Sequence, residues 1–432
     1  MSVLTSWRRL TRSEKPGARS RRALTLLVLV ALMTAAGLGG LGDGGRAAEA
    51  GASASPDPGA ARLPDARQLT QEAVEEQARS LDTSEVENYL QQINNDLSGY
   101  IPPLTLKNIL GLFTGRGSGY SFRDLVAGLW RYLARELVTN GKLLGKIVLL
   151  AVICAILANL GSAFEHNNVG SLAYYVCYMV MMGIALGSFA MAVGVARSLI
   201  DQLAGFLFAL LPSLIAMLAA TGALVSAGLL HPLMIATTNG TVLVVRDYVF
   251  PVLFFAAVVD VVSSLSEGIR VSNLVALLRQ VAITIMGLLF ALFLGVSAVQ
   301  GAAGAVGDGV TVRTAKFMAN TFIPVVGKMF ADASEVVIGS SLVLKNALGL
   351  LGALGVLLLA AAPLLKMVAL VLIYRLAAAM VQPLNAGRIG DLLNNMGTAL
   401  VQVLLCTGLV SVMFFVGITI IIAAGNMAAM MR

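Results

Sequence analysis

The last 292 residues of this chain form an almost uninterrupted series of apolar stretches, and no other feature limits its possible folds so strongly. Residues 141–432 carry only 14 Lys/Arg and 9 Asp/Glu. The whole chain is 58% hydrophobic and 12% charged, which is about half the charged fraction of a soluble protein. Because a transmembrane helix needs about 20 mainly apolar residues, the sequence predicts an all-α, polytopic integral membrane protein with the lipid bilayer as its first partner.

Candidate membrane spans follow one another closely along this apolar part. The stretch 224–245 is the weakest candidate, because His231, Pro232 and Asn239 are costly in lipid unless they face protein or water. Several connections are so short that some pairs of stretches could instead be re-entrant hairpins. We predict about six to nine transmembrane helices. The candidates are 143–164, 171–195, 203–222, 224–245, 248–265, 279–300, 346–364, 366–384 and 399–424.

The first 48 residues have the organisation of a cleavable secretory signal peptide. Residues 1–22 contain seven Lys/Arg, residues 23–38 carry no charge, and small residues follow at Ala47, Ala48 and Ala50. This order is typical of such signals. Since the apolar run is shorter than a normal span, we predict cleavage near Ala47 to Ala50, with an uncleaved signal anchor as the alternative. The same residues supply most of the net charge of +7, so no nucleic-acid partner is predicted.

Residues 49–140 are predicted to form a small exported region that contains amphipathic helices. Its beginning is rich in Ala, Pro, Asp and Arg, a composition typical of a flexible segment. Further on, an apolar face at helical spacing predicts an amphipathic helix just before the membrane domain of 141–432. We expect this helix either to lie on the bilayer surface or to pack on a partner helix. Its apolar face consists of Phe122, Leu125, Val126, Leu129, Trp130, Leu133 and Leu137.

Residues 301–345 are the longest part of the membrane domain that is not predicted to span. Four glycines surround Asp308, and Arg313 and Lys316 follow among apolar residues. The segment is too polar to span, yet a free loop would expose a large apolar patch. We therefore predict a re-entrant or interfacial segment that lines a cavity, with Arg313 and Lys316 on its polar face.

The motifs of common enzymes do not occur in this sequence. It contains two histidines and three cysteines, with no HExxH, no CxxC pair, no P-loop and no Gly-x-Ser-x-Gly elbow. The chain is therefore predicted to have no catalytic residue, no cofactor and no metal, and not to be an enzyme.

Ionisable residues within the apolar stretches are the remaining candidates for function. Such residues are rare in membranes and often line pathways or couple helices. Asp260 and Arg279 lie at the edges of apolar runs. For Arg246, Asp247, Arg279 and Arg375 the alternative is snorkelling to the interface or a structural pair. The candidate cavity or coupling residues are Arg313, Lys316, Asp308, Arg375, Arg246 and Asp247.

Several blocks of this sequence closely resemble one known family. They include SAVQGAAGAVGDGVTVRTAKF at 297–317, FIPVVGKMF at 322–330 and YRLAAAMVQPL at 374–384. Shorter blocks are ELVTNGKL at 136–143, AGLLHP at 227–232 and AGNMAAMMR at 424–432. Together they resemble the stage III sporulation protein AE family, from about residue 85 to the end of the chain.

The resemblance implies a role in endospore formation. The family belongs to an operon-encoded complex in the mother-cell membrane that surrounds the forespore. With a forespore partner, this complex builds a channel-like apparatus that supports forespore development and late forespore transcription. The implied partners are the other membrane proteins of the same complex, including a separate ATPase. No catalytic residues are defined for the family, so none are carried over.

A free-standing membrane transporter or permease is the alternative interpretation. The many predicted spans, the polar segment 231–241 and the intramembrane charges favour it. A transporter of this kind would work without partner proteins.

Overall fold

The computed structural model describes residues 74, 76–77, 83–106, 108–109, 122–163, 168–263, 271–322, 326–384 and 387–430. All of them belong to the second of the two units into which the chain divides, Pro64–Arg432. The signal peptide predicted at 1–48 lies outside these residues and stays a prediction. Within the described residues every regular element is helical, which confirms that the fold is all-α.

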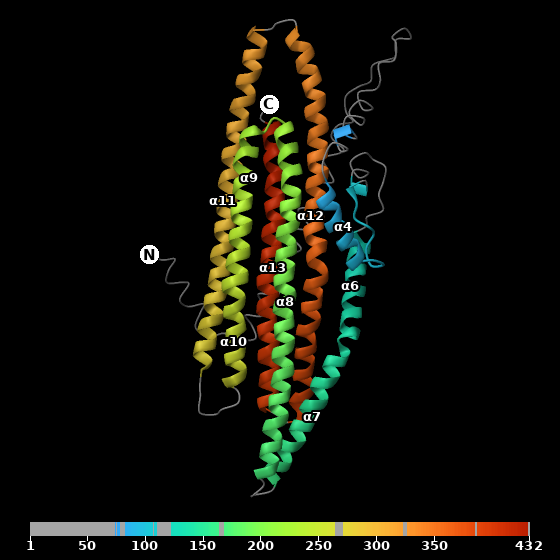
Figure 1. Cartoon of the computed structure of the whole chain (residues 1–432), viewed down its shortest axis with the longest axis vertical. Coiled ribbons are helices and arrows are strands. Elements are labelled where there is room, and N and C mark those ends of the chain that lie inside the picture. Colours follow the sequence, from blue (N-terminus) through green and yellow to red (C-terminus); the bar gives the residue numbers. More distant parts are fainter. Residues whose placement is uncertain are drawn as a thin grey trace, which may run out of the picture. The chain divides into compact units, whose positions relative to one another are not determined.

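Long helices connected by short turns make up the apolar part of the chain (Figure 1). A π-helical turn, η2 (Val245–Val249), joins α9 to α10, and a short 3-10 helix, η3 (Gln382–Leu384), precedes α13. The α-helices are α4 (Ser84–Asp96), α6 (Phe122–Thr139), α7 (Gly141–Ala163), α8 (Asn168–Ala220), α9 (Leu224–Val244), α10 (Phe250–Ser263), α11 (Ser272–Phe322), α12 (Val326–Val381) and α13 (Gly387–Met430).

Three pairs of predicted spans turn out to be single helical runs. The stretches 171–195 and 203–222 are both in α8, those at 346–364 and 366–384 are both in α12, and those at 224–245 and 248–265 join through η2. Only Leu365 lies between 346–364 and 366–384, and charged residues separate the members of the other two pairs, but a charge does not interrupt the backbone hydrogen bonds of a helix. Proline interrupts them more readily, yet α12 continues through Pro363. The predicted breaks were therefore wrong.

Five described helices are long and apolar enough to cross a membrane, or six if α6 and the beginning of α7 form one bent span. The predicted count of six to nine is thus not confirmed. The five are 172–220, 224–263, 272–311, 337–381 and 388–427, and each has at least 40 residues. At about 1.5 Å per residue, such helices reach 60 Å or more, about twice the hydrocarbon thickness of a bilayer.

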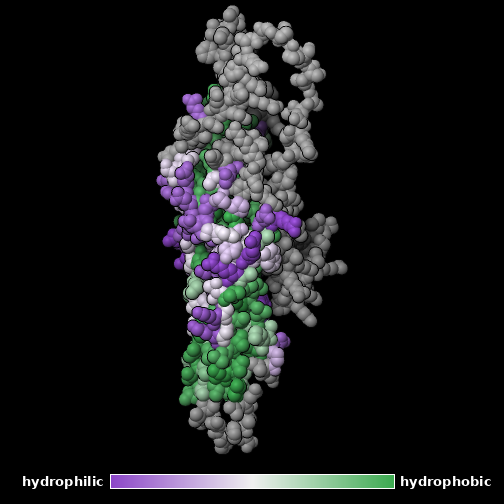
Figure 2. Space-filling model, turned by 90° about the vertical axis from the view of Figure 1, so that its right-hand side faces the viewer, coloured by the Kyte–Doolittle hydropathy of each residue, from purple (hydrophilic) through white to green (hydrophobic). Residues whose placement is uncertain are grey.

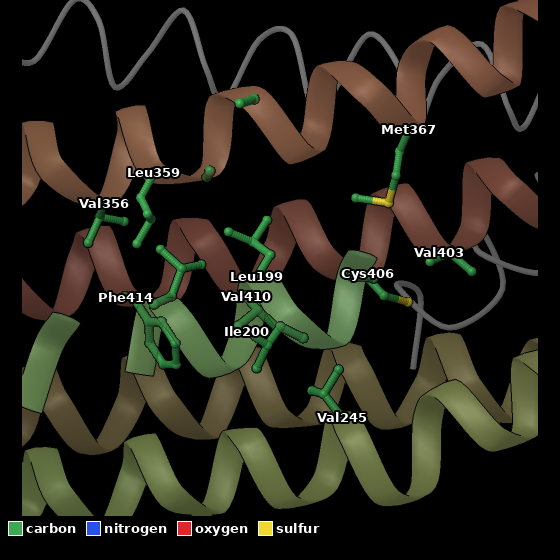
Figure 3. Close-up of a cluster of buried hydrophobic side chains, with 14 of the residues drawn as sticks. Leu199, Ile200, Val245, Val356, Leu359, Met367, Val403, Cys406, Val410 and Phe414 are labelled. Carbon is green, nitrogen blue, oxygen red and sulfur yellow. The ribbon is translucent and has the colours of Figure 1, made fainter. Parts of the chain in front are cut away.

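The hydrophobic core lies where α8, α12 and α13 pack on one another. Figure 3 shows part of it, with Leu199 and Ile200 of α8 close to Val410 and Phe414 of α13. The run α9–η2–α10 packs on α8 and α11, and α11 packs on α13. α7 covers α8 and α12.

The two helices before the membrane domain are amphipathic, as predicted. α4 buries Val86, Leu90 and Ile93, and it packs on α8 and α12. α6 packs on α12 and α7 and buries Leu133, but Trp130 is 68% exposed. Trp130 therefore contributes little to the fold and is free to contact lipid or a partner. Hydrophilic residues gather over the part of the surface where α4 and α6 lie (Figure 2).

Candidate functional site: charged groups between the helices

Asp308 caps the first turn of α9 from a distant helix. Its side chain, on α11, is fully buried. One carboxylate oxygen accepts a hydrogen bond from the backbone N–H of Val225 at 2.7 Å, and both oxygens lie 3.3 Å from the N–H of Ser226. These N–H groups have no partner within the helix, and the positive end of a helix stabilises a carboxylate. The predicted coupling residue Asp308 thus joins α11 to α9.

The glycines before Asp308 let the two helices approach closely. A Cβ atom at Gly304 would lie 2.5 Å from Oγ of Ser226, and one at Gly307 would lie 2.8 Å from Cγ1 of Val225. Both distances are shorter than real atoms allow. These glycines do not interrupt the helix, because α11 continues to Phe322. Their role is close packing, which small residues commonly provide between membrane helices.

The segment predicted as re-entrant or interfacial is divided between two continuous helices. Residues 301–322 are in α11, and residues 326–345 are in α12. An interfacial position of either part stays a prediction. Arg313 and Lys316 belong to α11, but their side chains lie outside the described part of the structure, and their cavity-lining role stays a prediction too.

Lys345 is a second fully buried charge, and it is not among the candidates predicted from the sequence. Its Nζ donates hydrogen bonds of 2.9 Å to the carbonyl oxygen of Ile422 and to Oδ1 of Asn426. Both acceptors are near the end of α13, where the helix dipole favours a cation. Asn426, a polar residue inside an apolar terminal stretch, was the available signal. Lys345 joins α12 to α13.

Arg246 and Asp247, predicted from their adjacency, occupy the π-helical turn η2. Nη1 of Arg246 lies 3.2 Å from Oδ1 of Asp201 in α8, and its Nε lies 3.9 Å from Oδ1 of Asp247. All three side chains are 45–59% exposed. An exposed ion pair contributes little to stability. This group therefore mainly places charged side chains of α8 and η2 at the same height of the bundle.

Asp260 and Arg279 form a largely buried ion pair. Nη2 of Arg279 in α11 lies 2.6 Å from Oδ2 of Asp260 in α10, and their side chains are 17% and 13% exposed. Nδ2 of Asn395 in α13 donates to the other carboxylate oxygen at 3.3 Å. The pair therefore holds three helices together.

Arg375, a predicted candidate, contacts the same part of α13. Its guanidinium donates to Oδ1 of Asn394 at 2.5 Å and to Oγ1 of Thr398 at 3.3 Å. Asn394 and Asn395 are adjacent, so one turn of α13 binds both Arg375 of α12 and Asp260 of α10. The structure thus distributes the predicted candidates among separate helix contacts.

The described residues contain no cluster of three or more His, Cys, Asp or Glu that could hold a metal ion. Asp308, Lys345, Asp260, Arg279, Arg375 and Arg246 each bind another helix. These ion pairs and hydrogen bonds connect the helices of the bundle.

Comparison with known proteins identifies the family. The family model for stage III sporulation protein AE matches residues 104–425. The chain belongs to the stage III sporulation protein AE family. A curated relative, "Stage III sporulation protein AE" of Bacillus subtilis (strain 168), is 38% identical over 368 residues, which cover 85% of this chain and 92% of the relative. No solved structure matches the chain. Membership of the stage III sporulation protein AE family confirms the resemblance and a role in sporulation. The names of the family and of the relative mention no reaction.

Proposed function

We propose that this chain is a non-enzymatic membrane component of the mother-cell side of a channel-like complex. The complex links mother cell and forespore during endospore formation, and it supports forespore development and late forespore transcription. Family membership supports the role in sporulation. The long apolar helices support a place in a membrane.

One structural observation favours a scaffold over a solute carrier. The buried charges Asp308 and Lys345 are bonded to helix ends, and Asp260 is bonded to Arg279. In a transporter, charged groups between the helices are expected to face a water-filled cavity or a substrate. Charges that are already bonded to neighbouring helices fix the arrangement of those helices.

The proposed location is the mother-cell membrane that surrounds the forespore, with the N-terminal region exported. The proposed partners are the other membrane proteins of the same operon complex, including a separate ATPase. The exposed Trp130 of α6 and the hydrophilic outer face of α4 fit a region that meets either the membrane surface or such a partner.

A free-standing transporter remains the second candidate, on one specific observation. The π-helical turn η2 interrupts the regular hydrogen bonding of an apolar run at Arg246 and Asp247. Such turns occur frequently at functional sites.

Two measurements on the full chain separate the candidates. The tagged chain, isolated in mild detergent from sporulating cells, should retain the other membrane proteins of its operon. The purified chain, alone in lipid vesicles, should move no solute above the rate of empty vesicles. Solute movement by the chain alone, without co-isolated operon proteins, would replace the proposed function with the transporter.

The cavity prediction for Arg313 and Lys316 is tested in a spore-forming strain whose own copy is deleted. The double variant R313E/K316E should abolish spore formation at normal protein level and membrane insertion. Normal spore formation by this variant would show that the two cations have no role in the complex.

A further inference from the structure

The side of α11 that faces away from the bundle is apolar over most of the helix. Leu288, Leu292, Val299, Val306 and Val310 are 55–70% exposed. At about 100° per residue, their spacing places all five within about 40° of one another around the helix. We call them the outer stripe of α11. They present on the order of 500 Å² of apolar surface, a size at which exposed patches mark interaction sites.

The outer stripe has the seven-residue spacing of a helix pair. Leu292, Val299 and Val306 are seven residues apart, and so are Gly295 and Ala302, which are exposed on the same side of α11. These two sets correspond to the a and d positions of a heptad, in which Leu288 is the preceding d position. A seven-residue apolar repeat is typical of paired helices, and the small residues at 295 and 302 let two helices approach closely.

Lipid cannot cover the whole apolar side of α11. Leu274, Leu277 and Val281 are 42–59% exposed and continue the outer stripe in the other direction. The exposed apolar side therefore extends over residues 274–310. At 1.5 Å per residue its length is about 54 Å, whereas the hydrocarbon core of a bilayer measures about 30 Å. A considerable part of this side must be outside the hydrocarbon.

The position of α4 along the bundle indicates which part of the apolar side of α11 is outside the hydrocarbon. The outer face of α4 carries the exposed residues Glu85, Glu87 and Asp96, so it cannot lie in hydrocarbon. A series of contacts across the bundle connects the height of α4 to the height of the outer stripe. The contacts are Tyr89 with Phe206, Leu210 and Ile418 with Gly352, and Gly417 with Phe293.

Phe206 and Leu210 are one helical turn apart, so Tyr89 of α4 and Phe293 of α11 differ in height by about one turn. The part of the outer stripe around Leu292 thus lies at the height of a hydrophilic helix on the other side of the bundle, outside the hydrocarbon (Figure 1). An apolar stripe in that position requires a protein surface to cover it.

We propose that residues 288–310 of α11 pair, in parallel, with the same residues of a second copy of this chain. Two copies inserted in the same direction present parallel α11 helices, and a parallel pair brings the same heptad positions of the two copies together. The paired stripe contains no charged residue, so self-association brings no like charges together. A two-fold contact of this kind is self-complementary. The inference goes beyond the proposed function and does not depend on it.

Cysteine cross-linking of the full chain tests this pairing directly. The chain is expressed in membranes of a host without sporulation proteins, after Cys154, Cys177 and Cys406 are each replaced by Ala. In a parallel pair, V299C and V306C place identical positions face to face, within the short Cβ–Cβ distance that a disulfide requires. Oxidation should convert each variant to covalent dimer at least tenfold more efficiently than I283C.

Ile283 is the matched control, because it is 49% exposed on the same helix but points away from the outer stripe. A302W, which fills a small d position, should reduce the V299C dimer at least tenfold, whereas I283W should not change it. Equal cross-linking of V299C and I283C would overturn the proposal. So would an insensitivity to A302W, or an adduct of V299C with a different protein in place of the dimer.

Discussion

Asp308 should contribute to stability through the two backbone donors that it caps. The variant D308A leaves the N–H groups of Val225 and Ser226 buried without this acceptor, at a cost of about 1–3 kcal/mol. D308N keeps one acceptor oxygen but loses the charge that the helix end favours. We therefore expect the thermal midpoint of the detergent-purified protein to decrease from wild type to D308N to D308A. An unchanged midpoint for D308A would show that α9 does not depend on this cap.

Asp260 and Arg279 should show strong energetic coupling. Removing one partner of a buried pair leaves an uncompensated charge and costs about 3–5 kcal/mol, whereas replacing both is far less costly. D260L and R279M should therefore each destabilise the protein more than the double variant D260L/R279M does. Denaturation of the purified variants measures this coupling. A double variant whose loss equals the sum of the single losses would show that the two side chains act independently.

The sequence predicted these charged residues better than it predicted their partners. Arg246 and Asp247 were selected because they are adjacent, but Asp201 is 45 residues away and has no local signal. Asp308 was selected because of its charge, yet its partners are backbone N–H groups, which leave no mark in an amino-acid sequence. Lys345 was not selected, because its acceptors become apparent only when α12 lies beside α13.

At the scale of the helix, Gly304 and Gly307 should control how closely α11 approaches α9. G304A and G307A place a methyl group against Ser226 and Val225, so each should destabilise the bundle by about 1–3 kcal/mol. Gly287 is the matched control on α11, since a Cβ atom there meets nothing within 4 Å. G287A should be neutral or slightly stabilising, because alanine favours the helix. Equal thermal midpoints for the three variants would contradict the close approach.

The helical nature of the chain follows from its sequence, but the continuity of the helices does not. Apolar stretches and the amphipathic pattern at 122–137 predicted the helices correctly. The segment around Arg197 and Asp201 was interpreted as a break, although α8 continues through it. The hydropathy of a stretch indicates whether it can lie in lipid, but it does not indicate where a helix ends. A helix continues as long as no residue breaks its backbone hydrogen bonds and neighbouring helices can pack on it.

At the scale of the whole molecule, the helices alternate in direction, so the number of crossings decides where the chain ends. α8, α9–α10, α11, α12 and α13 provide five candidate spans. α7 has 23 residues, and its two lysines, Lys142 and Lys146, are close to its beginning. A helix of this length measures about 34 Å and is long enough to cross the hydrocarbon. We therefore expect α7, continuing from the bent helix α6, to provide a sixth crossing.

Six crossings place both ends of the membrane domain on the same side of the membrane, and five place them on opposite sides. With an exported N-terminal region, we expect S84C to react with an impermeant thiol reagent in intact cells of the cysteine-free variant. Alkaline phosphatase fused after Arg432 should then be active, and green fluorescent protein at the same position should be dark. An unlabelled S84C would contradict export of the N-terminal region. Labelling of S84C together with a fluorescent C-terminal fusion would show that α7 does not cross, and the bundle would then have five spans with α7 lying against its side.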